Sequence, residues 1–132
     1  MHRSLRNAVI VLSLSVVVPS AAAWQTPTFT RTELQDHPLS APGRHGVMVR
    51  SEFPAGVASG RHFHPGEELG YVLEGTLELT LDGQAPKMLK AGDVIFIPAA
   101  TVHNARNAGT GIAKVLGTYV LETGKPLATP VK

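Results

Sequence analysis

The chain has 132 residues, no cysteine, and 12 Lys and Arg residues against 10 Asp and Glu residues. This length suits one domain with a single core, and the absence of cysteine excludes disulfides and thiolate metal ligands. The charge excess is small and no basic run is present, so neither nucleic acid nor an anionic membrane is an expected partner.

Residues 1–23 have the features of a secretory signal peptide. Arg3 and Arg6 precede an apolar run over 8–18, and small residues follow at 20–23. This 11-residue, predominantly apolar run is shorter than the roughly 20 residues that cross a bilayer, which argues against a membrane anchor. We therefore expect an exported protein, periplasmic or secreted, that starts near Trp24 and has no stable membrane association after signal removal. Its ten basic residues would balance its ten acidic ones.

Residues 24–44 are rich in Thr and Pro without a sustained period, and we interpret them as an irregular N-terminal arm, at most with a short strand near Phe29. Trp24 and Phe29 would pack on the exterior of the domain or on a second subunit. We expect a homodimer through an outer sheet face, covered in part by this arm. A loosely ordered terminus is the alternative.

Residues 45–122 form the expected domain, a series of short strands with turns between them. Leu77, Leu79 and Leu81 alternate with polar residues, and Asp82-Gly83 is typical of a hairpin turn. Gly117 is predicted to be a bulge or bend, and residues 123–132 a flexible tail. No stretch has a helical period, which predicts an all-β antiparallel sandwich or barrel. The expected strands lie at 47–53, 70–73, 76–81, 86–90, 94–97, 102–106 and 112–121.

A candidate metal site lies in the middle of this domain. His62 and His64 are two apart on an extended segment, so their side chains share a face. The Pro65-Gly66 turn can bring Glu67 or Glu68 to the same point, and His103 follows another strand. Three imidazoles and a carboxylate are a transition-metal ligand set. A packing role is the usual explanation for one such residue, but several buried titratable groups without a metal would each carry a desolvation penalty.

The spacing of these residues resembles the two motifs of the cupin superfamily. Gly56, His62-x-His64, Glu68 and Gly75 resemble the first motif position for position. Gly92, Pro98, His103 and Asn107 resemble the second. The usual glycine two residues after the proline is replaced here by Ala100, which suggests that this turn does not need a positive φ.

The resemblance implies a small single-domain cupin, an all-β jelly-roll-like antiparallel β-barrel in which the motifs face each other. It also implies the ligands His62, His64, Glu68 and His103, with Glu68 preferred over Glu67. The cofactor would be one divalent transition metal, Fe, Mn, Ni, Cu or Zn, with open positions for a small-molecule substrate.

Three functions agree with such a site. The first is a dioxygenase-like oxidoreductase acting on a chelated organic substrate, with Glu68 as a catalytic base. An isomerase or lyase is a variant of it, and a non-enzymatic module that binds a small ligand or metal is the alternative, since the fold alone does not decide. Arg50, Arg61 and Arg106 are weak candidates for orienting an anionic substrate. The apolar candidates for the mouth of the site are Met48, Phe53, Phe63, Tyr71, Phe96 and Tyr119.

Overall fold

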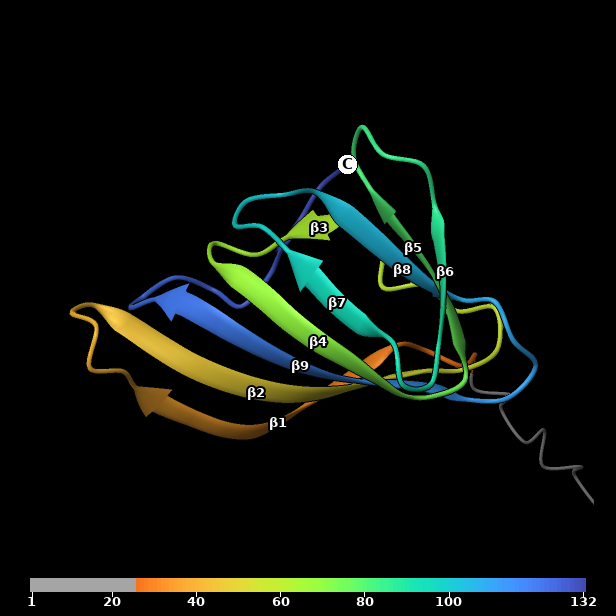
Figure 1. Cartoon of the computed structure of the whole chain (residues 1–132), viewed down its shortest axis with the longest axis horizontal. Coiled ribbons are helices and arrows are strands. Elements are labelled where there is room, and N and C mark those ends of the chain that lie inside the picture. The colour runs from red at the N-terminus through yellow and green to blue at the C-terminus, as the bar shows by residue number, and fades with distance from the viewer. Residues whose placement is uncertain (1–25) are drawn as a thin grey trace, which may run out of the picture.

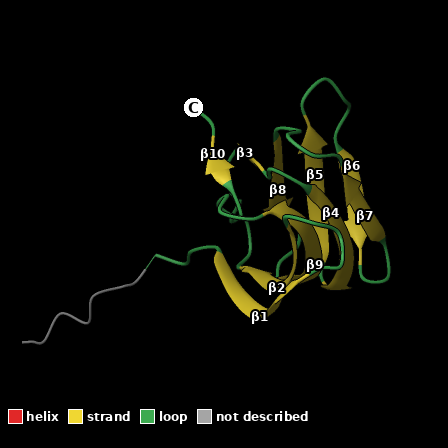
Figure 2. Cartoon of the chain, turned by 90° about the vertical axis from the view of Figure 1, so that its left-hand side faces the viewer, coloured by secondary structure: helices red, strands yellow, loops and turns green. Residues whose placement is uncertain are grey.

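The structure is a computed structural model that describes residues 26–132, in which all regular secondary structure is β-strand. The strands form two five-stranded antiparallel sheets, in the orders β1-β2-β9-β4-β7 and β10-β3-β8-β5-β6. Figure 1 shows the two sheets as separate layers, and Figure 2 shows β3 and β8 above β1 and β2. The strands are β1 (Thr30–Pro38), β2 (Arg44–Phe53), β3 (His62–Phe63), β4 (Glu67–Glu74), β5 (Thr76–Leu81), β6 (Lys87–Lys90), β7 (Val94–Ile97), β8 (His103–Asn107), β9 (Ala113–Glu122) and β10 (Thr129–Pro130).

This arrangement confirms the predicted all-β, jelly-roll-like fold class. Alternation along the strands produces the core, because every second side chain points between the sheets. Leu77, Leu79 and Leu81 of β5 are buried as expected, and they face apolar residues from the opposite sheet. The main core cluster is Phe53, Val72, Leu77, Leu79, Leu81, Ile95, Ile97, Ala113 and Val115.

The segment expected to be an irregular arm contains the nine-residue strand β1. It pairs with β2 along its length, from Thr30 opposite Glu52 to Pro38 opposite His45, with an irregularity between Glu33 and Gln35. The strand has no apolar alternation, because all but one of its residues are exposed. Hydrogen bonding to β2 therefore determines that this segment is a strand, and its residue pattern does not predict one.

Gly117 is neither a bulge nor a bend, contrary to the prediction. It pairs in regular register with Val49 on one side and Gly70 on the other. A Cβ atom built on Gly117 would lie 2.7 Å from the Tyr119 hydroxyl oxygen, closer than such atoms approach. This glycine therefore leaves space for the ring of Tyr119 between the sheets.

Ala100 has a φ of 59°, so the prediction that this turn avoids a positive φ is wrong. Among the described residues it is the one non-glycine residue with positive φ. Its N–H donates to the His64 carbonyl oxygen at 2.8 Å, and the Thr101 N–H donates to the Pro98 carbonyl oxygen at 3.2 Å. These bonds hold the turn in the left-handed region, at some cost because an L side chain is disfavoured there.

Asn107, the last residue of β8, ties three segments together. Its buried side-chain amide donates to the carbonyl oxygens of Phe53 and Gly111, both at 2.7 Å, and accepts from the Gly109 N–H at 2.8 Å. The side chain thus joins the end of β2 to the loop before β9. A buried amide with all these partners is a structural residue, in agreement with its motif position.

Two predictions concern residues outside this description. The predicted signal peptide, 1–23, and Trp24 precede the described residues. Within residues 26–132 there is no helix with the length and apolar character needed to cross a membrane.

Candidate metal centre

Three histidine side chains converge between the two sheets. His62 lies in β3, His64 directly follows that strand, and His103 begins β8 opposite His62. All three are buried, and the centroids of their rings lie 4.3 to 5.0 Å apart. One nitrogen from each ring lies within 4.8 Å of the others, close enough for one ion to contact all three. The predicted histidines are therefore brought together as the sequence suggested.

Each imidazole is oriented by a backbone carbonyl oxygen. The Nδ1 atoms of His62, His64 and His103 lie 2.7, 2.6 and 2.9 Å from the carbonyl oxygens of Gly60, Leu127 and Thr101, respectively. A carbonyl oxygen only accepts, so each Nδ1 carries the proton. In the neutral ring each Nε2 then carries a lone pair rather than a proton, the state in which imidazole binds metals.

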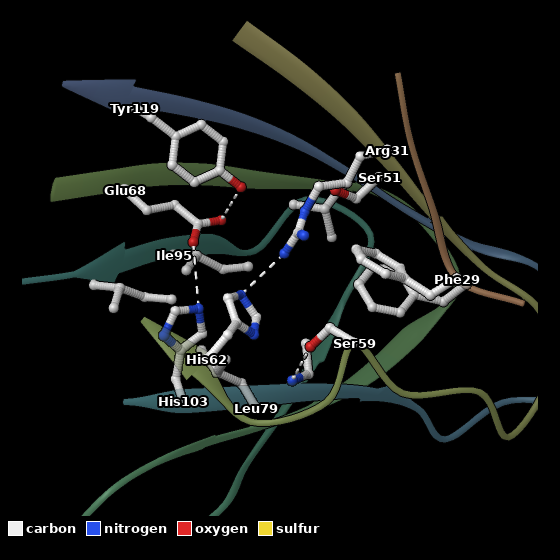
Figure 3. Close-up of a pocket in the computed structure, with 14 residues that line it drawn as sticks. Phe29, Arg31, Ser51, Ser59, His62, Glu68, Leu79, Ile95, His103 and Tyr119 are labelled. Carbon is white, nitrogen blue, oxygen red and sulfur yellow. Dashed lines mark hydrogen bonds and ion pairs between the residues drawn. The ribbon is translucent and has the colours of Figure 1, made fainter. Parts of the chain in front are cut away.

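The carboxylate comes from the opposite sheet. Glu68 of β4 is buried, whereas Glu67 is exposed, in agreement with the preference for Glu68. Its Oε2 lies 3.2 Å from His64 Nε2 and 3.6 Å from His103 Nε2. The Tyr119 hydroxyl of β9 donates to Glu68 Oε1 at 3.1 Å, so the other oxygen faces the imidazoles (Figure 3).

This donor set fits a cation. His64 Nε2 is buried and has no hydrogen-bond partner among the described residues, although it lies 3.2 Å from the carboxylate. A bare imidazole lone pair and a carboxylate oxygen repel each other at this distance unless a positive charge lies near both. Imidazole nitrogen and carboxylate oxygen suit a divalent transition metal.

Burial favours the neutral form of two of the imidazoles. Burial, reinforced by the neighbouring charges of His103, Arg31 and His64, lowers the pKa of His62 to about 4, although its bond to Gly60 opposes this. Burial also lowers the pKa of His103. Burial raises the pKa of Tyr119, and the Glu68 carboxylate raises it further, so the phenol remains a donor.

The carboxyl group itself is held in the charged form. Burial alone would raise the pKa of Glu68, but His64, His103 and the Tyr119 hydroxyl together lower it below its usual range. Positive charge beside this carboxylate, carried by the imidazoles or by a bound metal, therefore keeps it ionised.

A narrow pocket opens onto the cluster. His62, Glu68, His103 and Tyr119 line one end, and Arg31 reaches into it from β1 (Figure 3). Most of the remaining wall is apolar, namely Phe29, Phe53, Leu79, Ile95, Ile97, Ala105 and Val115.

Sequence reasoning missed Arg31, which lies in the segment expected to be irregular. Its Nη2 lies 3.0 Å from His62 Nε2. The arginines that were considered, Arg50, Arg61 and Arg106, lie on the surface and pair with Glu52, Asp82 and Glu78.

The aromatic candidates divide between the pocket and the surface. Phe53 and Tyr119 line the pocket, whereas Tyr71 and Phe96 are exposed on the outer sheet face. Phe29 packs on Phe53 of the same chain, with ring centroids 4.6 Å apart. This contact uses a residue that was expected to cover the exterior or a partner.

Comparison with known proteins supports the fold class and the candidate site described above. Residues 49–121 match the Cupin_2 family model, described as cupin domain. Over 78 residues the chain is 36% identical to dimethylsulfoniopropionate lyase DddQ of Ruegeria pomeroyi, covering 58% of this chain and 39% of that protein. Over 83 residues it is 31% identical to the transcriptional regulator PuuR of Escherichia coli, covering 62% and 44%. The match thus spans less than half of each of these relatives.

Among solved structures, the polyketide cyclase RemF from Streptomyces resistomycificus superimposes with a TM-score of 0.63. The two chains are 28% identical, and the match covers 79% of this chain and 71% of the other.

Proposed function

We propose, from the premise that the chain belongs to the cupin family, that it is a metal-dependent enzyme acting on a small organic substrate. One observation supports this above all others: three carbonyl-oriented imidazoles and a buried carboxylate converge at the end of a pocket. A purely structural site would have no need of an adjoining pocket.

His62, His64, His103 and Glu68 are the residues proposed to hold one divalent transition metal, Fe, Mn, Ni, Cu or Zn. When bound, such a metal supplies Lewis acidity toward a substrate oxygen and, if it is Fe or Mn, the electron transfer that dioxygen chemistry requires. The carbonyls of Gly60, Leu127 and Thr101 fix the imidazoles in the required tautomer.

Glu68 is the proposed proton acceptor. The Tyr119 hydroxyl occupies its Oε1, and Oε2 faces the imidazoles, so Glu68 would leave the metal in order to take a proton from a substrate in the adjoining pocket. A proton taken at Oε2 converts the carboxylate to its neutral form, and the Tyr119 bond keeps that group in place. Apolar walls exclude bulk water, which strengthens these polar interactions.

The reaction class we propose is that of a dioxygenase-like oxidoreductase. A lyase or isomerase is the second candidate, favoured by the 36% identity to an enzyme named as a lyase and by the Glu68–Tyr119 pair, which suits proton transfer without redox chemistry. A binding module without catalysis is the third.

The decisive experiment is metal analysis followed by an activity screen. Apo-protein is loaded with Fe(II), Mn(II), Ni(II), Cu(II) or Zn(II), and oxygen uptake is followed with phenolic and diketone substrates. We expect about one metal per chain and oxygen uptake with Fe or Mn. Substrate consumption without oxygen uptake would indicate the lyase or isomerase. Metal binding without any turnover would support the binding module, and a protein that takes up no metal would refute the proposal.

The Glu68→Gln variant separates the roles of the carboxylate, with the exposed Glu67→Gln as its matched control. If Glu68 is the base, the variant loses at least a hundredfold in turnover per bound metal ion, with the metal content of parent and variant measured alongside. A Glu68→Gln variant with parental turnover would contradict this role.

We also propose that the protein is exported and acts as a homodimer. Export rests on the composition of residues 1–23, and cell fractionation with N-terminal sequencing of the mature protein tests it. The dimer rests on the outer face of β4 and β7, where Leu69 pairs with Phe96 and Tyr71 with Val94. All four are exposed, Val94 by 74%.

An apolar patch of this kind on an edge strand favours a protein partner, and a second copy would cover it symmetrically. Light scattering should give twice the chain mass, and Val94→Lys/Phe96→Lys should halve it. A parent protein with the mass of one chain across micromolar concentrations would exclude the dimer.

A further inference from the structure

We propose that Arg31 forms the anion-binding half of the substrate site and that the substrate class is a small monocarboxylic acid with a compact apolar body. The inference rests on the proposed function for the reacting end of the substrate. It assigns a role to a residue in β1, outside the part of the chain that matches the cupin domain model.

Arg31 is the inward-facing residue of an otherwise exposed strand. Every other residue of β1 is exposed, whereas Arg31 is half-buried and lines the pocket. An arginine at a sheet edge would normally extend into solvent. The same strand exposes Leu34 and turns Arg31 inward, the reverse of what burial of apolar surface alone would give. The inward position of the guanidinium therefore indicates a function.

The Arg31 guanidinium senses the charge of Glu68 but contacts no carboxylate of the described residues. Within residues 26–132 Arg31 forms no ion pair, while Arg50, Arg61 and Arg106 each contact a carboxylate on the surface. Arg31 Nε is buried without a hydrogen-bond partner. The guanidinium carbon lies 4.7 Å from the centroid of Phe29, which holds the group in position from one side. Buried, unpaired donors of this kind favour an acidic ligand.

The contact that Arg31 does make is with a proposed metal ligand. Its Nη2 donates to His62 Nε2 at 3.0 Å, the lone pair that the metal would need. One lone pair cannot serve both, so Arg31 and a metal compete for it. With His62 engaged by the metal, the arginine offers its planar set of N–H donors to the pocket, and this set matches the two oxygens of a carboxylate.

The rest of the wall limits the ligand. Among the described residues, Arg31 is the one Lys or Arg side chain that lines the pocket, which disfavours ligands with several negative charges, such as nucleotides. Phe29, Phe53 and Val115 present apolar surface, and the hydroxyls of Ser51 and Ser59 add neutral polar groups. A single carboxylate at Arg31 and an apolar body against these walls fit this distribution.

Paired ligands test the proposal. Propanoate and benzoate are compared with propanamide and benzamide, which have the same shape without the charge. Dissociation constants are measured by titration with zinc-loaded and metal-free protein, so that a carboxylate bound directly by zinc is recognised. The variants are Arg31→Gln and Arg31→Lys, and Arg50→Gln serves as the control, because Arg50 is exposed on the adjacent strand.

We expect the parent to bind benzoate at least tenfold more tightly than benzamide in zinc-loaded protein. Arg31→Gln should lose at least tenfold in benzoate affinity while its benzamide affinity and zinc content stay at the parental values. Arg31→Lys should recover part of the loss, because it restores the positive charge but not the planar set of N–H donors. Arg50→Gln should match the parent.

Three results would overturn the proposal: no preference of the parent for carboxylate over amide, unchanged benzoate affinity in Arg31→Gln, or loss of zinc from that variant with its carboxylate preference intact. The last would make Arg31 a positioning residue for His62. A failure of the proposed function is distinguishable, because it appears as absent zinc binding or turnover, and the carboxylate preference is still measured in metal-free protein.

Discussion

The two sides of the site are built in different ways. The imidazole wall consists of His62, His64 and His103. These residues lie in or directly after the two-residue strand β3 and at the start of the five-residue strand β8. The carboxylate wall, Glu68 and Tyr119, stands on β4 and β9, which have eight and ten residues. Loop and tail carbonyls orient the imidazoles, whereas paired central strands hold Glu68 and Tyr119.

This difference shows that the imidazole wall depends on distant parts of the chain. The carbonyl that orients His64 belongs to Leu127, 63 residues away. Regular sheet pairing is cooperative and tolerates local changes, while a side chain oriented by one loop carbonyl does not. Changes in loops and tail should therefore affect metal affinity more than fold, and changes in strands should affect the carboxylate.

The largest effect should follow from removing imidazoles. We expect His62→Ala/His103→Ala to lose nearly all bound metal, as measured by elemental analysis. Metal at a thousandfold excess over its Kd stabilises a native state by roughly 4 kcal/mol, and the variant should lose that increment. His37→Ala/His45→Ala is the control on exposed or partly exposed histidines. Equal metal content in parent and double variant would show that the ligand assignment is wrong.

The next largest effect concerns the link between the two sheets. Asn107→Ala leaves the Phe53 and Gly111 carbonyls without their donor, and we expect a loss of about 2–4 kcal/mol in the free energy of unfolding, measured with denaturant. The neighbouring Asn104→Ala is the control, because that side chain is only partly buried. Equal losses in both variants would remove the special role of Asn107.

Removal of the tail tests the imidazole wall directly. Deleting residues 127–132 removes the acceptor of His64 Nδ1 and the pairing of β10 with β3. We expect metal affinity, measured by competition with a chelator, to fall about 10–100-fold. Leu127→Ala keeps the carbonyl and trims only the side chain, so it should retain most of the affinity. A deletion with parental affinity would mean that His64 needs no such orientation.

A smaller effect is expected on the carboxylate wall. Tyr119→Phe removes the donor to Glu68 Oε1, and we expect metal affinity to fall about tenfold, with a stability change of about 1 kcal/mol or less. Tyr71→Phe, on the exposed outer face, should change neither. A larger loss here than in the tail deletion would reverse the order of sensitivity inferred for the two walls.

The smallest effect is a gain in stability beside the imidazole wall. Ala100→Gly relieves a positive φ, and we expect an increase of about 0.5–1 kcal/mol in the free energy of unfolding. A glycine also makes the unfolded chain more flexible, which opposes this gain. Pro98, two residues earlier, has a fixed φ and limits that added flexibility. Unchanged metal affinity would show that the strain serves no purpose at the site, and a decrease would show that it orients His103.

Much of the fold followed from the sequence alone, because its signals are local. Alternation over Leu77, Leu79 and Leu81 and the Asp82-Gly83 turn predicted β5 and its reversal, and the structure has both. The two-residue spacing of His62 and His64 placed them on one face without any knowledge of the partner strand. The buried Glu68 was distinguished from the exposed Glu67 only through the resemblance, since both neighbour the same turn.

Other features depended on tertiary contacts. β1 forms because β2 offers a hydrogen-bonding edge. The exposed residues of β1 show no alternation from which a strand could be predicted. For the same reason Arg31 was overlooked, since only the pairing of β1 with β2 turns that side chain toward His62. Gly117 was interpreted as a bend because a lone glycine in a strand often is one, but the ring of Tyr119 two residues later explains it.

The amino-acid sequence by itself thus determined most strand positions along the chain, the all-β class and the types of residue at the centre, since hydrophobic alternation, turn residues and short-range spacing act within a few residues. The jelly-roll-like architecture followed from the resemblance to the cupin motifs. Only the tertiary structure decided which nitrogen of each imidazole is free, which oxygen of Glu68 Tyr119 occupies, and which arginine enters the pocket. These properties arise from single hydrogen bonds between residues up to 63 positions apart, and spacing along the chain carries no information about them.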